Sequence, residues 1–198
     1  MGSAEVTHSR RADAVANHAR ILEAASLVLV ERGLDMEMDE VALRAGVGVG
    51  TLYRHFANRD AMVQAILAQT FEGLLTHLRA AAAIEDPSAA LREIPFTLVT
   101  LQSVFPVLRD PRCTKLMHDM KHEMSRTMVD EITALVSGIV ERGARSGAFR
   151  ADLDPAATAS AILGSIGAVL ESLGAKRPLL ELAEILADLH HGMVTARR

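Results

Sequence analysis

The stretch Val41–Phe56, with the sequence VALRAGVGVGTLYRHF, decides the expected fold of the N-terminal part of this chain. In its first half, apolar residues occupy positions i, i+1 and i+4 as Val41, Ala42 and Ala45, which is the spacing of one buried helix face. Gly46 follows where a helix commonly ends in a left-handed residue, a conformation that glycine adopts without a Cβ clash. The segment therefore predicts a helix that ends in a glycine turn.

The second half of the stretch predicts another short helix, because Leu52 and Phe56 are spaced i, i+4 and form an apolar face. In a helix-turn-helix motif, one helix braces against the DNA backbone while the next enters the major groove. Taken alone, the pattern also fits an ordinary helical hairpin. The polar side chains left to reach phosphates, thymine methyls or base edges are Thr51, Tyr53, Arg54 and His55.

The sequence GVGVGTLYRHF, followed by Asn58-Arg59-Asp60, closely resembles the DNA-binding domain of the TetR family of transcriptional regulators. The resemblance extends from about Ala14 to Leu67 and includes the preceding segment ILEAASLVLVERG. It implies a three-helix helix-turn-helix domain that binds a double-stranded DNA operator. The residues expected at the DNA are Arg44, Gly48, Gly50, Thr51, Tyr53, Arg54, His55 and Arg59.

The roles of these residues follow from helix geometry and from the resemblance. Thr51 and Tyr53 stand near the start of the second helix of the motif and are the best candidates for base or phosphate contacts. Arg44 and Arg59 are placed to contact backbone phosphates. Arg54 and His55 are expected to add phosphate contacts or to pack against the first helix. Gly48 and Gly50 are expected to let the backbone approach DNA closely.

Three positions depart from the family's pattern. Glu37 stands where Ser or Thr usually caps the first helix of the motif, and its charge would repel DNA. Gly48 replaces a common Ser cap, and Val49 replaces a position that is often polar or basic. Fewer polar groups therefore remain to distinguish one operator sequence from another.

Composition is compatible with a soluble, cytoplasmic protein. The chain has 198 residues, 49% of them hydrophobic, which is enough for a substantial core in one two-part protein or two small domains. The single cysteine, Cys113, excludes an intrachain disulfide and multi-cysteine zinc frameworks. No secretory signal is expected, and charged residues are expected to interrupt every apolar run before it reaches a membrane-spanning length.

The net charge is unusual for a DNA-binding protein, because the chain is formally −4 at pH 7. Charge acts locally, however, within roughly 10 Å at 0.1 M salt. Acidic residues cluster between positions 31 and 40, whereas residues 41–59 contain three arginines and no acid. We therefore expect an acidic protein with a small basic surface that faces DNA.

Nearly the whole chain predicts helix, because alternating strand patterns are absent and Gly and Pro fall between periodic segments. The expected fold is all-α: an N-terminal arm and three-helix helix-turn-helix domain, residues 1–58, followed by a helical effector-binding and dimerisation domain, residues 59–198. The first four expected helices cover about 12–32, 38–45, 49–55 and 58–83, the last with Asn58 as its N-cap. Pro87 opens a fifth, in which Pro95 marks a kink or the start of a new helix. Of the remaining helices, one covers about 112–146, one begins at Pro155 after Asp154, and one begins at Pro178.

The last two predicted helices are candidates for a homodimer interface. Residues 155–173 are rich in Ala, Gly and Ser, which allow close helix packing, and residues 179–194 place apolar side chains at helical spacing. The resemblance implies that two such helices form a four-helix bundle with those of a partner. Alternatively, they close the core of the monomer.

A small-molecule effector site is implied by the resemblance and expected in the C-terminal domain. Methionine suits an adaptable apolar cavity because its side chain is flexible and polarizable, although the same residues would serve in any helical core. Cys113 and His118 are possible polar contacts in it. The candidate lining residues are Phe71, Leu75, Phe96, Leu101, Phe105, Met117, Met120, Met124 and Met128.

Other chemistries find little support in the sequence. His118 and His122 are spaced i, i+4, a spacing that can bind zinc or nickel, but further ligands would have to come from elsewhere. Nothing resembles a nucleophile triad, a phosphate-binding loop or an H-E-x-x-H site. We expect no metal, no cofactor and no enzymatic activity.

The sequence thus predicts a ligand-responsive transcriptional regulator, and specifically a repressor that a small-molecule effector releases from a palindromic operator. The alternative is a helical protein that binds a small molecule or a metal and does not act through DNA.

Overall fold

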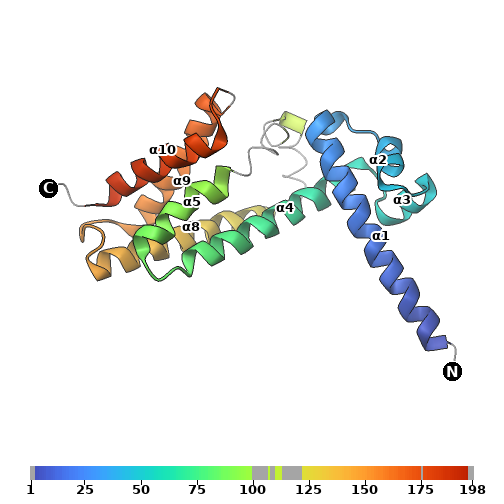
Figure 1. The fold of residues 1–198 in the computed structure, drawn as a ribbon, viewed down its shortest axis with the longest axis horizontal. Helices are drawn as coiled ribbons and strands as arrows, with labels where there is room; N and C mark the ends of the chain where they lie inside the picture. Colours follow the sequence, from blue (N-terminus) through green and yellow to red (C-terminus); the bar gives the residue numbers. More distant parts are fainter. Residues whose placement is uncertain (1–2, 100–106, 108–109, 113–121, 175, 196–198) are drawn as a thin grey trace. The chain divides into compact units, whose positions relative to one another are not determined.

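The computed structural model describes residues 3–99, 107, 110–112, 122–174 and 176–195, with side chains described from residue 16 onwards except at 122–127. Within these residues the secondary structure consists of eight α-helices and the single-turn 3-10 helix η1, labelled as in Figure 1. No strand occurs in this part of the chain. The prediction of an all-α fold is confirmed.

The chain forms two compact units. The first unit comprises Met1–Thr70 and Pro106–Met120, and the second comprises Phe71–Phe105 and Lys121–Arg198. Helix α4 (Arg59–Ala82) contributes to both, because the division falls inside it. We predicted a boundary between residues 58 and 59, whereas the first unit extends into α4 and includes a later segment of the chain.

The first unit contains α1 (Ser3–Arg32), η1 (Gly33–Asp35), α2 (Met38–Ala45) and α3 (Val49–His55). Helices α2 and α3 begin and end where the sequence predicts. Helix α1 starts earlier than the predicted residue 12, because no Gly or Pro interrupts residues 3–12. The helix ends at Gly33, which has a φ of 61°.

The core of the first unit is the apolar stripe of α1 packed against its neighbours. Ile21, Ala25, Val28 and Leu29 are fully buried, as their helical spacing predicts. The buried residues that they join on α2, on α3, just after α3 and at the start of α4 are Val41, Ala42, Ala45, Leu52, Phe56, Met62, Val63, Ile66 and Leu67. This packing gives the short helices α2 and α3 a fixed support.

The second unit is built from the end of α4 with α5 (Pro87–Val99), α8 (His122–Ser146), α9 (Pro155–Leu173) and α10 (Leu179–Val194). Helix α5 packs mainly on α10, and α8 packs mainly on α9 (Figure 1). One continuous apolar cluster lies between these helices. The second unit therefore has its own core.

Side-chain caps start two of the helices as predicted. The Asn58 Oδ1 atom accepts a hydrogen bond of 2.8 Å from the Ala61 N–H at the start of α4. The Asp154 Oδ1 atom accepts one of 2.8 Å from the Ala157 N–H at the start of α9. Glu37 makes no such side-chain bond to α2. Each cap stabilises its helix by about 1 kcal/mol, so α2 depends more on its packing.

Pro95 lies inside α5 and is buried, so the helix does not begin there. Of the two alternatives predicted for Pro95, a new helix that starts there is therefore wrong. Proline has no N–H, and the backbone bond from position 95 to the carbonyl of Leu91 is therefore absent. Burial of the apolar face of α5 compensates for it.

Helix α9 is long and apolar enough to cross a membrane by length and composition alone. This corrects the expectation that charges interrupt every apolar run, because Glu171 is the only charged residue in α9. One such helix is weak evidence for a membrane span, since core helices pass the same test. However, only 22% of the apolar window is buried in the structure. Most of α9 therefore presents small and apolar side chains to the surroundings.

Candidate nucleic-acid interface

The turn between α2 and α3 has the geometry of a helix-turn-helix motif. Gly46 adopts the left-handed conformation with φ 65° and ψ 35°, and its N–H bonds to carbonyls at the end of α2. The Val47 N–H donates to the Ala42 carbonyl over 3.0 Å, which completes the turn. Gly48, in an extended conformation, then precedes α3. These bonds fix the direction in which α3 leaves the turn.

Helix α3 buries one face and exposes another. Leu52 and Phe56 are 0% and 4% exposed, as their i, i+4 spacing predicts. On the adjoining part of the helix, Val49 and Tyr53, also spaced i, i+4, are 42% and 49% exposed. Thr51 is half-buried, and its N–H donates to the Gly48 carbonyl over 2.8 Å. Of the predicted DNA contacts, Tyr53 is thus presented to solvent, and Thr51 is presented in part.

Arg44 is already paired. Its two terminal nitrogens donate to the two carboxylate oxygens of Glu31, each over 2.8 Å. The pair lowers the pKa of Glu31, chiefly through this hydrogen bond. The contact was not predicted from the sequence, because the partners are 13 residues apart and on different helices. The charge of Arg44 is therefore largely offset before any phosphate approaches.

Arg59 is also held within the first unit. Its Nη1 atom donates to the Leu34 carbonyl of η1 over 2.8 Å. Its other nitrogens lie 3.3–3.4 Å from the Asp60 carboxylate. Arg59 therefore fixes the start of α4 against η1, and only part of its guanidinium remains for a phosphate.

Arg54 and His55, at the end of α3, differ in their surroundings. Arg54 is exposed, and its Nε donates to the Gly50 carbonyl over 3.2 Å. His55 is half-buried, with its ring centroid 5.7 Å from that of His18 on α1. The His18 ring also stacks on Phe56, at 5.0 Å between centroids. Of the two placements considered for His55, the structure favours packing against the first helix.

The two glycines next to Val49 have open surroundings. A Cβ atom added at Gly48 or Gly50 would meet no atom within 4 Å. Both residues have negative φ values, so neither the backbone nor the surrounding protein requires glycine there. The absence of side chains at these two positions leaves the start of α3 free for close approach by another molecule.

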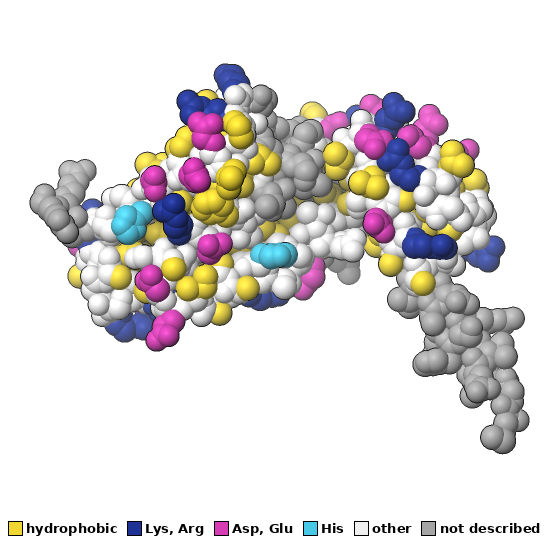
Figure 2. Space-filling view, in the orientation of Figure 1, with side chains coloured by type: hydrophobic (Ala, Val, Ile, Leu, Met, Phe, Trp, Pro, Cys, Tyr) yellow, Lys and Arg dark blue, Asp and Glu magenta, His cyan; other side chains and the backbone are white. Residues whose placement is uncertain are grey.

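Charges of both signs are intermixed around the motif. Figure 2 shows acidic and basic side chains side by side on the drawn face of the first unit. The described contacts explain this pattern, because Arg44 and Arg32 pair with Glu31 and Glu40. No extended basic patch is seen on that face.

Segment 110–112, which lies in sequence between the two parts of the second unit, contributes a further arginine to the first unit. Arg112 Nη1 donates to Asp35 of η1 over 2.7 Å, and Arg112 Nη2 donates to Asp110 over 2.7 Å. These bonds lower the pKa of both carboxyl groups. The sequence interpretation missed this contact, because 77 residues separate Arg112 from Asp35. The bonds attach segment 110–112 to the end of α1 and η1.

The predicted effector site is described only in part. Leu75 belongs to the core of the second unit, and Phe71, Phe96 and Met128 pack against that core. The remaining predicted lining residues lie outside the described residues or side chains, namely Leu101, Phe105, Met117, Met120 and Met124. Cys113, His118 and the His122 side chain lie outside them too. Among described residues, no cluster of three or more His, Cys, Asp or Glu could hold a metal.

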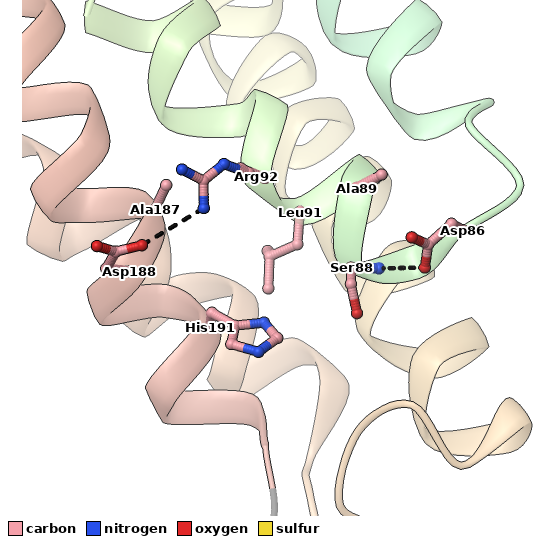
Figure 3. A pocket seen from close by; sticks show the side chains of 8 residues that line it. All are labelled: Asp86, Ser88, Ala89, Leu91, Arg92, Ala187, Asp188 and His191. Carbon is pink, nitrogen blue, oxygen red and sulfur yellow. Dashed lines mark hydrogen bonds and ion pairs between the residues drawn. The ribbon is translucent and has the colours of Figure 1, made fainter.

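A cavity of about 310 Å³ lies between α5 and α10, away from the predicted set. Figure 3 shows Leu91 at its centre and His191 beside it. The polar groups at its rim bond to one another: Arg92 donates to Asp188 over 3.4 Å, and the Ser88 N–H donates to Asp86 over 3.0 Å. The rim therefore has one more acidic than basic side chain, because Asp86 bonds only to a backbone N–H.

His190 is the one buried polar or charged residue in the described part of the chain. Its Nε2 atom lies 2.8 Å from the Ser165 hydroxyl, which itself donates to the Ile162 carbonyl over 2.7 Å. The Ser165 oxygen therefore accepts from His190 Nε2–H, and Nδ1 has no partner among the described residues. Burial lowers the pKa of His190 to about 4. A neutral ring thus connects α10 to α9.

These features define an all-α helix-turn-helix protein with a second helical unit. Residues 21–66 match the family model described as bacterial regulatory proteins, tetR family. Residues 21–66 therefore form a DNA-binding domain of the kind found in that family, as the resemblance predicted. The matched segment covers α2, α3 and their supports in α1 and α4.

One relative is itself described as a helix-turn-helix regulator. An HTH-type transcriptional regulator of Staphylococcus aureus (strain USA300) is 33% identical over 70 residues, which are 35% of this chain and 38% of that protein. The sequence match therefore spans well under half of that relative.

Solved structures extend the likeness in fold to both units. A TetR transcription regulator from Haloarcula marismortui has a TM-score of 0.76 at 17% identity, over 92% of this chain and 100% of that chain. The regulator FadR from Bacillus subtilis, in complex with stearoyl-CoA, has a TM-score of 0.69 at 18% identity, over 89% and 98%. The C-terminal part thus shares the family's fold and not only its length and helical character.

Proposed function

We propose that this protein is a DNA-binding transcriptional regulator, and specifically a repressor that a small-molecule effector releases from a palindromic operator. The observation that carries the proposal is the α2–Gly46–α3 motif, which exposes one face of α3 on a buried support. A helix presented in this way fits the major groove of B-DNA. Family membership of this domain supports the same function.

The proposal includes a homodimer formed through α9 and α10. The outer face of α9 carries exposed small residues, among them Ala161, Gly164 and Ala168. On α10, Ile185 and Leu189 are 40% and 47% exposed and are spaced i, i+4. A second copy of this surface would bury both faces in a four-helix bundle with two-fold symmetry. Two copies of α3 would then meet two half-sites of a palindrome.

The effector site is proposed for the second unit, around Phe71, Leu75 and Phe96. These side chains line its core. The structural neighbour FadR, whose structure contains stearoyl-CoA, supports a ligand site in this fold without identifying the ligand of this chain. The effector would favour a form of the protein with altered operator affinity, and DNA would weaken effector binding by the same factor.

Arg112 is a candidate connection between the two activities. The described segment 110–112 belongs to the first unit. Its Arg112 bonds to Asp35, next in sequence to Leu34, whose carbonyl accepts from Arg59. An effector that weakened the Arg112–Asp35 bond would therefore alter contacts at the base of the DNA-binding motif.

Selection from random double-stranded DNA tests the proposal directly. We expect the purified protein to enrich a palindrome whose half-sites lie about one helical turn apart or a multiple of it. Affinity for the selected site should fall steeply with salt, because phosphate contacts release counterions. Tyr53→Ala should bind that site much more weakly while keeping its helical circular-dichroism spectrum.

The alternative function makes the opposite prediction. A helical protein that binds a small molecule or a metal without acting through DNA would enrich no sequence, and its weak DNA binding would be the same for all sites. That result, from a protein shown to be folded, would exclude the proposed regulator.

A further inference from the structure

The exposed face of α3 carries an apolar side chain at its first position. Val49 and Tyr53 stand at i, i+4 on this face and are 42% and 49% exposed. Gly48 and Gly50, on either side of Val49, contribute no side chain. Val49 therefore keeps 42% of its surface open on the proposed binding face.

The nearby polar side chains do not compensate for this. Arg44 donates both terminal nitrogens to Glu31, and Arg59 donates to the Leu34 carbonyl. Arg54 lies at the other end of α3, five residues after Val49 along the chain. The side chain of Val49 itself offers only methyl groups, and the hydroxyl groups of Thr51 and Tyr53 lie further along α3.

This chemistry restricts what Val49 can contact in a major groove. Guanine, adenine and cytosine present hydrogen-bonding atoms there, and these lose water without replacement when they face a valine. Thymine alone presents a methyl group on C5. Burying one methyl against another is favourable, and the small neighbours Gly48 and Gly50 allow the close approach that such a contact needs.

We propose that Val49 is a specificity-determining residue that contacts the C5 methyl group of a thymine in each operator half-site. The inference rests on the proposed DNA-binding function and adds the chemical basis of its selectivity. Recognition at this position depends on an apolar contact and not on a hydrogen bond. The 5-methylcytosine base carries the same methyl group and is expected to satisfy Val49 in part.

The test begins with the operator selected by the wild-type protein, so that DNA binding is established first. Each thymine of that operator is then replaced singly by uracil, which removes only the methyl group. We expect one symmetry-related pair of positions at which uracil weakens binding by about fourfold per half-site, the factor for one methyl-sized apolar contact. Uracil at the other thymines should have less effect.

Variants assign the effect to Val49. Val49→Ala should distinguish the thymine and uracil operators less than the wild type does, because the two Cγ methyl groups are gone and only the shorter Cβ methyl remains. Val49→Lys, tested in a new selection, should enrich guanine at that position, since lysine donates to guanine O6 and N7. Leu27→Ala is the matched control: Leu27 is a similarly exposed apolar residue, 53% exposed on α1, and its loss should leave the uracil effect unchanged.

The outcomes separate this inference from the proposed function. If the wild-type protein selects an operator but no uracil substitution weakens binding, or if Val49→Ala retains the full uracil effect, the thymine contact is wrong and the regulator stands. If no operator is selected at all, the proposed function fails first. Melting curves for each variant confirm that a weaker affinity does not come from loss of folding.

Discussion

At the scale of single residues, the arginines proposed to contact DNA are not equivalent. Arg44 is paired with Glu31 and Arg59 with Asp60, while the described bond of Arg54 uses only its Nε atom. A cation whose charge is already offset contributes less to counterion release when it meets a phosphate. The salt dependence of DNA binding therefore distinguishes these side chains.

We expect Arg54→Ala to lower the slope of log affinity against log salt by about 0.9 for each half-site. Arg44→Ala should change the slope less, because its charge is shared with Glu31. The measurement is operator affinity over a series of salt concentrations, with Arg150→Ala in the second unit as the control. Equal slopes for Arg54→Ala and the wild type would remove Arg54 from the phosphate contacts.

His190 makes the stability of the second unit sensitive to acid. Burial lowers the pKa of its ring to about 4, from about 6.5 in an unfolded chain. As pH falls below 6.5, the unfolded chain takes up a proton that the folded protein does not bind until about pH 4. The contribution of the neutral His190 ring to the free energy of unfolding is therefore fully present above pH 6.5. It is lost progressively as pH falls from 6.5 towards 4.

Urea unfolding of the wild type and His190→Leu at pH 7 and pH 4.5 measures this contribution. The free energy of unfolding of the wild type should decrease by roughly 1–3 kcal/mol more than that of the variant between the two pH values. Other groups titrate in both proteins and cancel in the difference. The same decrease in both proteins would show that His190 is not held neutral by burial.

At the scale of helices, α3 combines modest stability with an accessible surface. Gly50 lies inside this helix, where alanine is intrinsically more stable by about 1 kcal/mol. Nothing in the protein lies within 4 Å of an added Cβ atom at this position. The glycine therefore costs stability without any internal benefit that the structure describes.

Gly50→Ala should consequently raise the free energy of unfolding by up to about 1 kcal/mol and at the same time weaken operator binding. Gly138→Ala on α8, where an added Cβ also meets no atom within 4 Å, is the matched control for helix stabilisation. It should stabilise the protein without changing DNA affinity. A Gly50→Ala variant that binds the operator as tightly as the wild type would show that DNA does not approach this position closely.

The sequence was most informative where local chemistry determines structure. Gly46, Asn58 and Asp154 marked helix boundaries correctly, because caps and left-handed residues depend on a few neighbouring residues. The buried positions of α3 followed from i, i+4 spacing in the same way. Helix ends that no Gly, Pro or cap residue marks were predicted less accurately, as the early start of α1 shows.

Contacts between distant residues were not predictable. The partner of Arg44 is on another helix, and Arg112 reaches Asp35 across 77 residues. Charge and spacing identify a candidate cation, but only packing shows which carboxylate it meets. The sequence therefore predicted the helix-turn-helix geometry and overestimated the number of arginines free to bind phosphate.

At the scale of the whole molecule, the surface of α9 requires an explanation. Only 22% of its apolar window is buried within one chain, although the helix is long and nearly uncharged. Exposed small residues at Ala161, Gly164 and Ala168 would let a second helix approach closely. In a homodimer this surface is buried, and the apolar character of α9 then follows from its interface.

Ala161→Arg tests the homodimer, because an arginine has room in a single chain but would place a charge between two closely packed copies of α9. We expect the variant to sediment as a monomer with an unchanged helical spectrum, while the wild type sediments as a dimer. Ala134→Arg, at an exposed position on α8, is the control and should remain dimeric. A monomer binds one half-site at a time, so operator affinity should fall by roughly a hundredfold or more. A variant that stays dimeric would place the interface elsewhere, and the low burial of α9 would then need another partner.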